Sequence, residues 1–221
     1  MATEIDKKLL IELIEKAKAV SKPRNFTQAV DMQIAIEGLD LKKPENRIRL
    51  TVKLPHQSEL KKIAFFGEGE LASKALEAGA VVFSEKSIES LAGSKKELKK
   101  IAKEYTFFLV EPKLLSKVSK IMGPVLGPRG KVPQVVPPNV DVKSLIGELK
   151  NSVYIYVKNI PTISVKIGDE KMNSEELAEN ALAVIRAVES KLPEKAYIRN
   201  IYIKLTMGPP VKLSLGKLGR R

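Results

Sequence analysis

The stretch that decides the fold lies near the C-terminus, at residues 197–213, and reads Y-I-R-N-I-Y-I-K-L-T-M-G-P-P-V-K-L. Apolar and polar residues alternate from Ile201 to Thr206, which is the period of a strand with one buried face. The alternation stops at residues 206–210, where a glycine is followed by two prolines that cannot donate to a sheet. We therefore expect a half-buried strand that ends abruptly in a rigid turn.

The residues at the end of this strand suit contact with RNA. Thr206 offers a hydroxyl, Met207 a thioether, and Gly208 a bare backbone that a partner can approach closely. Hydroxyls and backbone groups are the usual contacts to a ribose and phosphate chain. A strand that merely ends in a proline turn explains the same residues, so the rest of the chain must decide between the two interpretations.

The composition predicts a soluble, folded protein with an anionic partner. Of 221 residues, 43% are hydrophobic. No apolar run reaches the roughly 18 residues of a membrane span, and the N-terminus is too acidic for a signal peptide. The chain has no Cys and one His, which excludes disulfides and thiol chemistry and makes a metal site improbable.

The formal charge of +13 points to nucleic acid among soluble partners. Residues 1–62 and 153–221 together carry an excess of nine positive charges, whereas residues 63–152 carry an excess of four. A basic surface that only reflects a Lys- and Glu-rich composition is the alternative. The distribution favours a nucleic-acid surface built by the two ends of the chain.

The two ends of the chain show the same sequence pattern, with amphipathic helices and strands in which apolar and polar residues alternate. Helices are expected at residues 5–20 and from Ser174, and strands at residues 26–37, 47–53, 153–157, 162–168 and 197–206. Strands this close in the sequence predict an antiparallel hairpin from the first two and another from the next two.

The middle of the chain follows a different pattern, in which short apolar runs alternate with helices. The runs lie at residues 63–66, 81–83 and 107–110, and helical segments are expected at residues 70–78, 88–105, 113–122 and 140–150. Such alternation is typical of a parallel sheet covered on both faces.

These patterns predict two domains of the α/β and α+β classes. Neither end has enough layers for a core, so residues 1–62 and 153–221 should form one discontinuous α+β domain with an antiparallel sheet. Residues 63–152 should form an inserted, Rossmann-like three-layer α/β domain. The two connections between them allow a hinge opening.

The inserted domain raises the hypothesis of a nucleotide-dependent enzyme. Gly67 and Gly69 lie between a strand and a helix, as in a dinucleotide fingerprint, and Ala72 stands in the third place. Glu68 and Glu70, however, would repel a pyrophosphate. We therefore expect no enzyme activity and no cofactor.

Residues 122–133 close the inserted domain with alternating Gly and Pro, which predicts a stiff, non-repetitive loop. Arg129 and Lys131 are a second candidate contact for RNA or tRNA. A loop that only caps the sheet is the alternative.

Three motifs in order establish a resemblance that covers essentially the whole chain: L-G-P-R-G at residues 126–130, V-K-I-G at residues 165–168, and T-M-G-P at residues 206–209. They resemble the large-subunit ribosomal protein L-one family, although its I-x-I-G motif has Val in the first place here. K-V-P-Q at residues 131–134 is similar to the archaeal branch. Gln57, where the family has Gly, is a departure that bears on the flexibility of the junction.

The resemblance implies a structural constituent of the large ribosomal subunit. Members bind large-subunit rRNA, form the mobile stalk near the tRNA exit site, assist release of deacylated tRNA, and repress translation of their own mRNA at a site that mimics the rRNA. The expected partners are thus rRNA, exit-site tRNA and the protein's own mRNA, with no membrane. The free protein is expected to be a monomer in the cytoplasm.

The resemblance also places the RNA-binding residues in the terminal domain. They are Phe26, Thr27, Ile167, Gly168, Lys204, Thr206, Met207 and Gly208. With only 5% aromatic residues and no Trp, we expect recognition of folded RNA by shape rather than stacking on an aromatic platform. A generic basic DNA-binding module remains the alternative, and it predicts equal affinity for duplex DNA.

Overall fold

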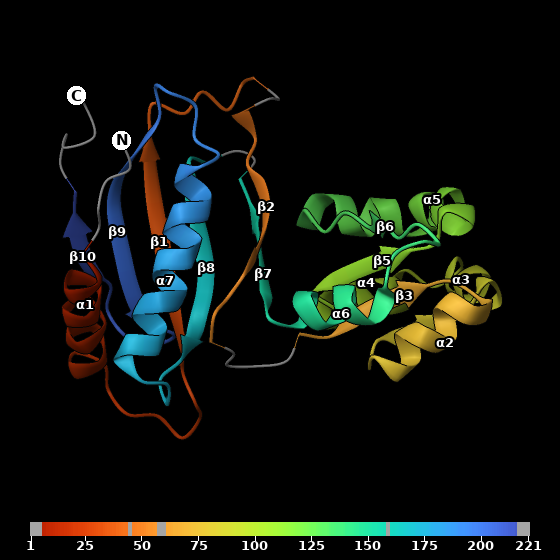
Figure 1. Cartoon of the computed structure of the whole chain (residues 1–221), viewed down its shortest axis with the longest axis horizontal. Coiled ribbons are helices and arrows are strands. Elements are labelled where there is room, and N and C mark those ends of the chain that lie inside the picture. Colours follow the sequence, from red (N-terminus) through yellow and green to blue (C-terminus); the bar gives the residue numbers. More distant parts are fainter. Residues whose placement is uncertain (1–5, 44–45, 57–60, 158–159, 216–221) are drawn as a thin grey trace. The chain divides into compact units, whose positions relative to one another are not determined.

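The chain forms two compact units (Figure 1). The computed structural model describes residues 6–43, 46–56, 61–157 and 160–215. Residues 1–59 and 153–221 make up the terminal unit, and residues 60–152 the inserted unit. The exact domain bounds expected from the sequence stay a prediction, because residues 57–60 at the first junction lie outside the described part.

The terminal unit is built on a four-stranded antiparallel sheet to which both ends of the chain contribute. Its strands, in spatial order, are β10 (Val211–Ser214), β9 (Tyr197–Leu205), β1 (Ala29–Glu37) and β8 (Thr162–Asp169). The strand expected from the alternation at residues 197–206 is confirmed as β9. It pairs with β1 along almost its whole length, so the C-terminal part completes a sheet that the N-terminal part begins.

The two hairpins expected from the sequence are wrong. β2 (Arg49–Lys53) pairs with β7 (Ser152–Tyr156) in a separate two-stranded sheet, which the Val157 N–H extends by donating to the Ile48 carbonyl at 2.9 Å. For the first hairpin the reason is that a strand has only two edges to offer. Both edges of β1 are taken, by β8 and β9, so β2 must pair elsewhere.

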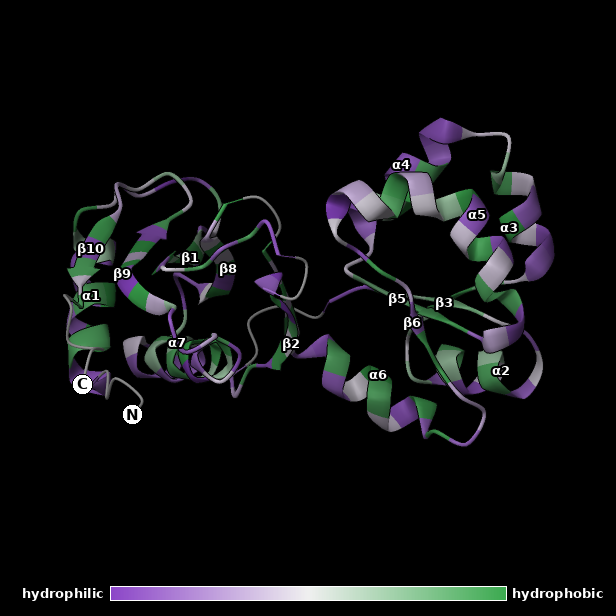
Figure 2. Cartoon of the chain, turned by 90° about the horizontal axis from the view of Figure 1, so that it is seen from above, coloured by the Kyte–Doolittle hydropathy of each residue, from purple (hydrophilic) through white to green (hydrophobic). Residues whose placement is uncertain are grey.

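Two helices cover one face of the main sheet, α1 (Lys7–Ala19) and α7 (Ser174–Glu189) (Figures 1 and 2). The Asp6 carboxylate caps α1 by accepting from the Lys8 N–H at 3.1 Å, whereas Thr3 lies outside the described residues. The Asn173 side chain caps α7 in a capping box with Glu176. The apolar stripe expected on α7 is confirmed as core: Leu177, Ala181, Val184, Ile185 and Val188.

The inserted unit contains a parallel sheet, as expected. The strands lie in the order β4 (Val81–Phe83), β3 (Ile63–Phe66), β5 (Phe107–Val110) and β6 (Gln134–Val135). The two central strands are buried at every position, which is why they appear in the sequence as continuous apolar runs instead of alternating ones.

Helices lie on both sides of this sheet (Figure 2), so the three-layer α/β architecture is confirmed. On one side are α3 (Glu85–Leu91), α4 (Lys95–Glu104) and α5 (Leu115–Leu126), and on the other are α2 (Gly69–Glu77) and α6 (Val142–Lys150). Short 3-10 turns, η2 (Pro112–Leu114) and η3 (Gly127–Arg129), flank α5. Within the described ranges, none of the helices has the length and apolar character needed to cross a membrane.

Two of the expected helix bounds in this unit are wrong. The single helix at residues 88–105 is two helices, because the chain turns at Gly93 and the Ser94 hydroxyl accepts from the Glu97 N–H to start α4. The helix expected to end at Met122 continues through Pro124 to Leu126.

The start of the first junction is anchored to α7 by side chains. The buried Asn180 amide accepts from the His56 N–H at 2.9 Å and donates to the carbonyls of His56 and Ile167, both at 2.8 Å. The neighbouring Glu179 carboxylate bonds Lys7 at 2.7 Å and the His56 ring at 2.5 Å. These contacts hold the pKa of Glu179 to about 2, with the bond from Lys7 as the larger cause.

The Glu179 carboxylate should therefore stabilise the fold in a pH-dependent way. Its pKa is lower in the folded chain than the usual 4.5, so its contribution is complete above pH 4.5 and is lost as the pH falls towards 2. The difference in thermal midpoint between the wild type and Glu179→Gln should be steady at pH 5 and vanish near pH 2. Glu12→Gln, an exposed carboxylate on α1, is the control. A difference that does not change over this range contradicts the account.

Candidate RNA interface

Three connections meet at one end of the main sheet, the lower end in Figure 1. They are the segment before β1, the turn after β8, and the turn between β9 and β10. Antiparallel pairing puts them together, because β1 begins where β8 and β9 end. Seven of the eight predicted RNA-binding residues lie at this end of the sheet, either in the connections or in the last two residues of β8 or β9. The eighth, Ile167, lies one residue further from the end of β8.

One buried side chain, that of Gln28, holds the three connections together. It is 1% exposed, and its amide nitrogen donates to the Lys22 carbonyl at 3.2 Å and to the Glu170 carboxylate at 3.3 Å. Its amide oxygen accepts from the Met207 N–H at 3.1 Å. The Gln28 backbone also exchanges two hydrogen bonds with Glu170. We call this set the Gln28 bracket.

The sequence analysis missed Gln28, and the reason is physical. A single polar residue between Thr27 and the first buried position of β1 is equally compatible with an exposed loop. Two of its three partner residues, Glu170 and Met207, are more than 140 residues away, so the local sequence carries no signal of them.

The turn at the end of β9 carries both bonded and exposed groups. The Thr206 hydroxyl accepts from the Ala29 N–H at 3.0 Å, and the Thr206 N–H donates to the Ala29 carbonyl at 3.0 Å. The Thr206 hydroxyl therefore stabilises the pairing of β9 with β1. In contrast, Met207 is 59% exposed and Phe26 is 50% exposed, beside the exposed Thr27. These side chains are available for contact with a partner.

Gly208 is required by packing inside the protein. A Cβ atom at this position would overlap the Ser21 hydroxyl and lie 3.1 Å from the Ser21 Cβ. The Ser21 hydroxyl is itself held by the Ala17 carbonyl at the end of α1, at 2.7 Å. The turn thus lies directly against the end of α1. Ser21 fills part of the space beside Gly208 in which the sequence analysis places a partner.

Ile167 and Gly168 lie at a β-bulge, and this corrects one expectation. Val30 pairs with Gly168 and the next residue of β1, Asp31, with Lys166, so Ile167 is an extra residue. Its side chain is 0% exposed and cannot contact RNA directly. Gly168 is buried as well, and a larger residue would not fit, since a Cβ there would lie 2.7 Å from the Met172 sulfur and overlap Leu177. Both residues shape the turn that carries Glu170.

Lys204 lies on the sheet face opposite the helices. It is paired across the strands with Asp31, whose other neighbour is Lys166. Desolvation raises the pKa of Asp31, and the two lysines oppose this shift. This face therefore carries both lysines and an aspartate next to the Gln28 bracket.

Comparison with known proteins decides the family. The model of the Ribosomal protein L1p/L10e family matches residues 14–209. This chain belongs to that family. Proteins described as Large ribosomal subunit protein uL1 are similar over nearly the whole length: that of Pyrobaculum neutrophilum is 45% identical over 96% of both chains, and that of Methanocaldococcus jannaschii 39% over 98% of this chain and all of its own. These relatives confirm the archaeal type.

Membership answers two questions that the sequence raised. The family consists of structural ribosomal proteins, so this chain is not an enzyme, and its place is the cytoplasmic ribosome. The inserted unit agrees with this: Glu68 accepts from the Glu85 N–H at 3.0 Å, and Glu111 accepts from the Glu68 N–H at 3.3 Å. The Glu68 N–H of the Gly67–Gly69 turn is thus bonded within the protein, and the Glu68 carboxylate stays at this turn.

The two residues of the second candidate contact, Arg129 and Lys131, have different environments in the structure. The Lys131 ammonium donates to the Ala102 and Tyr105 carbonyls at 2.9 and 2.6 Å, which caps the end of α4, and desolvation lowers its pKa. Lys131 is therefore occupied, contrary to expectation. Arg129 donates once, to Val125 at 2.9 Å, and is otherwise exposed. No cluster of potential metal ligands occurs among the described residues of this family member.

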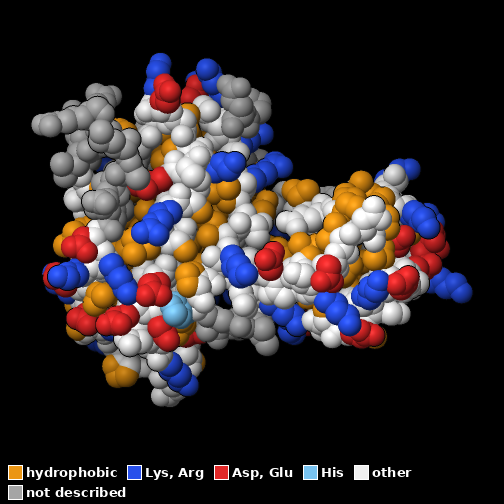
Figure 3. Space-filling view, viewed as in Figure 1, with side chains coloured by type: hydrophobic (Ala, Val, Ile, Leu, Met, Phe, Trp, Pro, Cys, Tyr) orange, Lys and Arg blue, Asp and Glu red, His pale blue; other side chains and the backbone are white. Residues whose placement is uncertain are grey.

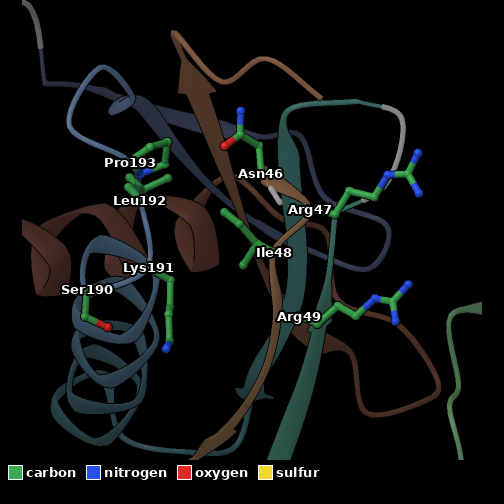
Figure 4. A pocket seen from close by; sticks show the side chains of 8 residues that line it. All are labelled: Asn46, Arg47, Ile48, Arg49, Ser190, Lys191, Leu192 and Pro193. Atoms are coloured by element: carbon green, nitrogen blue, oxygen red, sulfur yellow. The ribbon is translucent and has the colours of Figure 1, made fainter. Parts of the chain in front are cut away.

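Away from the Gln28 bracket, the terminal unit has a face of mixed charge and a basic groove. On the face that carries α1 and α7, basic and acidic side chains are interspersed (Figure 3). A groove of about 350 Å³ lies between the start of β2 and the end of α7 (Figure 4). It is lined by Asn46, Arg47, Ile48, Arg49, Ser190, Lys191, Leu192 and Pro193. The groove is basic and lies at the other end of α7 from the Gln28 bracket.

Gly208→Ala should lower the free energy of unfolding by about 1–3 kcal/mol, because the new methyl group forces the turn away from Ser21. Chemical denaturation measures this change. Ser21→Gly in the same chain should restore much of the loss by vacating the space.

The matched control is Gly147→Ala, at an exposed position of α6 where a Cβ meets nothing within 4 Å. It should stabilise the protein by up to about 1 kcal/mol. A neutral Gly208→Ala would show that the turn does not depend on close packing.

Proposed function

We propose that this family member binds large-subunit rRNA at the end of the terminal unit that the Gln28 bracket organises. One observation carries the proposal: Gln28 fixes three segments so that the exposed Phe26 and Met207 stand beside backbone groups of a rigid turn. The relatives named as large-subunit proteins support rRNA as the partner.

The recognition proposed is of RNA shape. Exposed Met207 and Phe26 exclude water against sugars and base edges, while backbone groups of the turn bond 2′-hydroxyls. Lysines such as Lys204 neutralise phosphates and make the affinity depend on salt. Because the bracket orders the segments before RNA arrives, little conformational entropy is lost on binding.

The bound protein would form the mobile stalk beside the tRNA exit site, as the resemblance implies. A binding surface of this kind would also accept a site of the same shape on the protein's own mRNA and so repress its translation. The two RNAs would then compete for one surface. A free protein that binds both RNAs at once contradicts this shared-surface proposal.

Release of exit-site tRNA needs a second surface, and we propose the β2–β7 pair for it. Arg47 and Arg49 are exposed there, and the Arg49 guanidinium lies 5.2 Å from the centre of the Tyr156 ring. Tyr154 stacks on Tyr156 with ring centres 6.5 Å apart. This surface combines phosphate-binding charge with aromatic faces, and it is distinct from the Gln28 bracket.

The rRNA site is tested by replacing its exposed side chains. Phe26→Ala with Met207→Ala should weaken binding of a stalk-like rRNA fragment by about 2–4 kcal/mol, since each removes a desolvated contact of about 1–2 kcal/mol, with little change in stability. Fluorescence anisotropy at several salt concentrations measures the affinity.

The matched control is the buried Ile167→Val, which should lower stability by about 0.5–1.5 kcal/mol and leave affinity nearly intact. If the exposed pair binds rRNA as tightly as the wild type, the proposed interface is wrong.

The tRNA surface is tested separately on ribosomes that carry the variant protein. Arg47→Gln with Arg49→Gln should weaken binding of deacylated tRNA and reduce the salt slope by about one for each arginine that contacts a phosphate. The affinity of the free variant for rRNA should not change. Unchanged tRNA binding would exclude β2 as the contact.

A further inference from the structure

The open face of the main sheet carries an acidic side chain where a simple phosphate-binding surface would have none. Val30, Met32 and Ile34 face the helices, so the alternate residues of β1, among them Asp31, lie on the other side. Asp31 is half-buried and stands directly opposite Lys204 on β9.

The Asp31 carboxylate has no hydrogen-bond or ion-pair partner within the described part of the chain, although lysines lie opposite it on both neighbouring strands. The ammonium of Lys166 pairs with Asp169 instead, at 2.8 Å. Some other carboxylates of this unit are bonded, among them Glu37 to Arg199 at 3.3 Å and Glu179 to Lys7 at 2.7 Å. A half-buried carboxylate without a hydrogen-bonded partner can accept hydrogen bonds from a ligand.

A carboxylate on an RNA-binding face lowers affinity by repelling phosphates. It raises affinity where it accepts hydrogen bonds from the RNA, either from a 2′-hydroxyl or from the amino and imino groups of a base, and only the second kind of contact distinguishes one base from another. Asp31 lies in the strand that begins at the Gln28 bracket, so RNA bound there lies next to it.

We propose that Asp31 and Lys204 read the Watson–Crick edge of an unpaired guanine in the bound RNA. Guanine presents two adjacent donors, N1–H and the N2 amino group, which match the two oxygens of a carboxylate. Its O6 acceptor lies beside them and matches the Lys204 ammonium. Adenine, cytosine and uracil each present only one donor group on this edge, so they leave one oxygen of the Asp31 carboxylate without a hydrogen bond.

Tyr202 completes the arrangement. It lies two residues from Lys204 on the same face of β9 and is paired across the strands with Gln33 of β1. Its ring is thus a diagonal neighbour of Asp31, at the spacing that aromatic side chains bridge. A guanine lying flat on this ring would reach Asp31 and Lys204 with its edge.

This inference rests on the proposed rRNA function and is tested with the full chain. Asp31→Asn removes a negative charge, so a surface that binds by charge alone predicts equal or tighter binding of a stalk-like rRNA fragment. The reading of guanine predicts binding weaker by about ten- to a hundredfold. Glu12→Gln, which makes the same change of charge on the helix-covered face, should not weaken binding. Thermal unfolding confirms that the variants fold.

A second measurement uses the wild-type protein and changes only the RNA. Inosine, which lacks the N2 amino group, replaces each unpaired guanine of the fragment in turn. At one position it should weaken wild-type binding about tenfold or more and leave binding by Asp31→Asn unchanged, because the lost contact is already absent.

The possible outcomes distinguish failure of this inference from failure of the proposed rRNA binding on which it rests. If the wild type prefers the stalk-like fragment over an unrelated hairpin but Asp31→Asn binds as tightly as Glu12→Gln, the reading of guanine by Asp31 is wrong and the function stands. The same conclusion holds if no inosine substitution matters. If the wild type shows no preference between the two RNAs, the rRNA proposal itself fails, and this inference with it.

Discussion

A buried amide must find hydrogen-bond partners, and that requirement shapes the functional end of this protein. The Gln28 side chain satisfies it on three segments that are far apart in the sequence, at Lys22, Glu170 and Met207. Loss of any one segment would leave a polar group buried without a partner, at a cost of about 1–3 kcal/mol. The bracket thus makes the strand ends behave as one rigid surface, which side chains on separate loops could not do.

Several residues that first suggest a ligand instead build this surface. Gly208 makes room for Ser21, Gly168 for Met172, and the Thr206 hydroxyl closes the pairing of β9 with β1. Such residues matter for RNA binding because they position their neighbours. The groups left to meet a partner are few, chiefly the exposed Phe26 and Met207 beside them.

The sequence predicted what local pattern controls, and the remainder depended on distant contacts. Alternation in β9 and the apolar runs of the inserted unit follow from burial of alternate or successive residues. Ile167 fits a strand equally well with or without the bulge that buries it, and only pairing with β1 decides. Lys131 looks free until the end of α4 comes next to it. Edge competition around β1 likewise separates β1 from β2, although they are neighbours in the chain.

Hydrogen exchange of the backbone amides, with and without a stalk-like rRNA fragment, tests the location of the interface most directly. The account predicts that RNA slows exchange in residues 22–28, 168–172 and 206–208, which are the segments joined by the Gln28 bracket. Exchange near Arg129 in the inserted unit should change little. Protection confined to the inserted unit, with none in the three segments, would contradict the account.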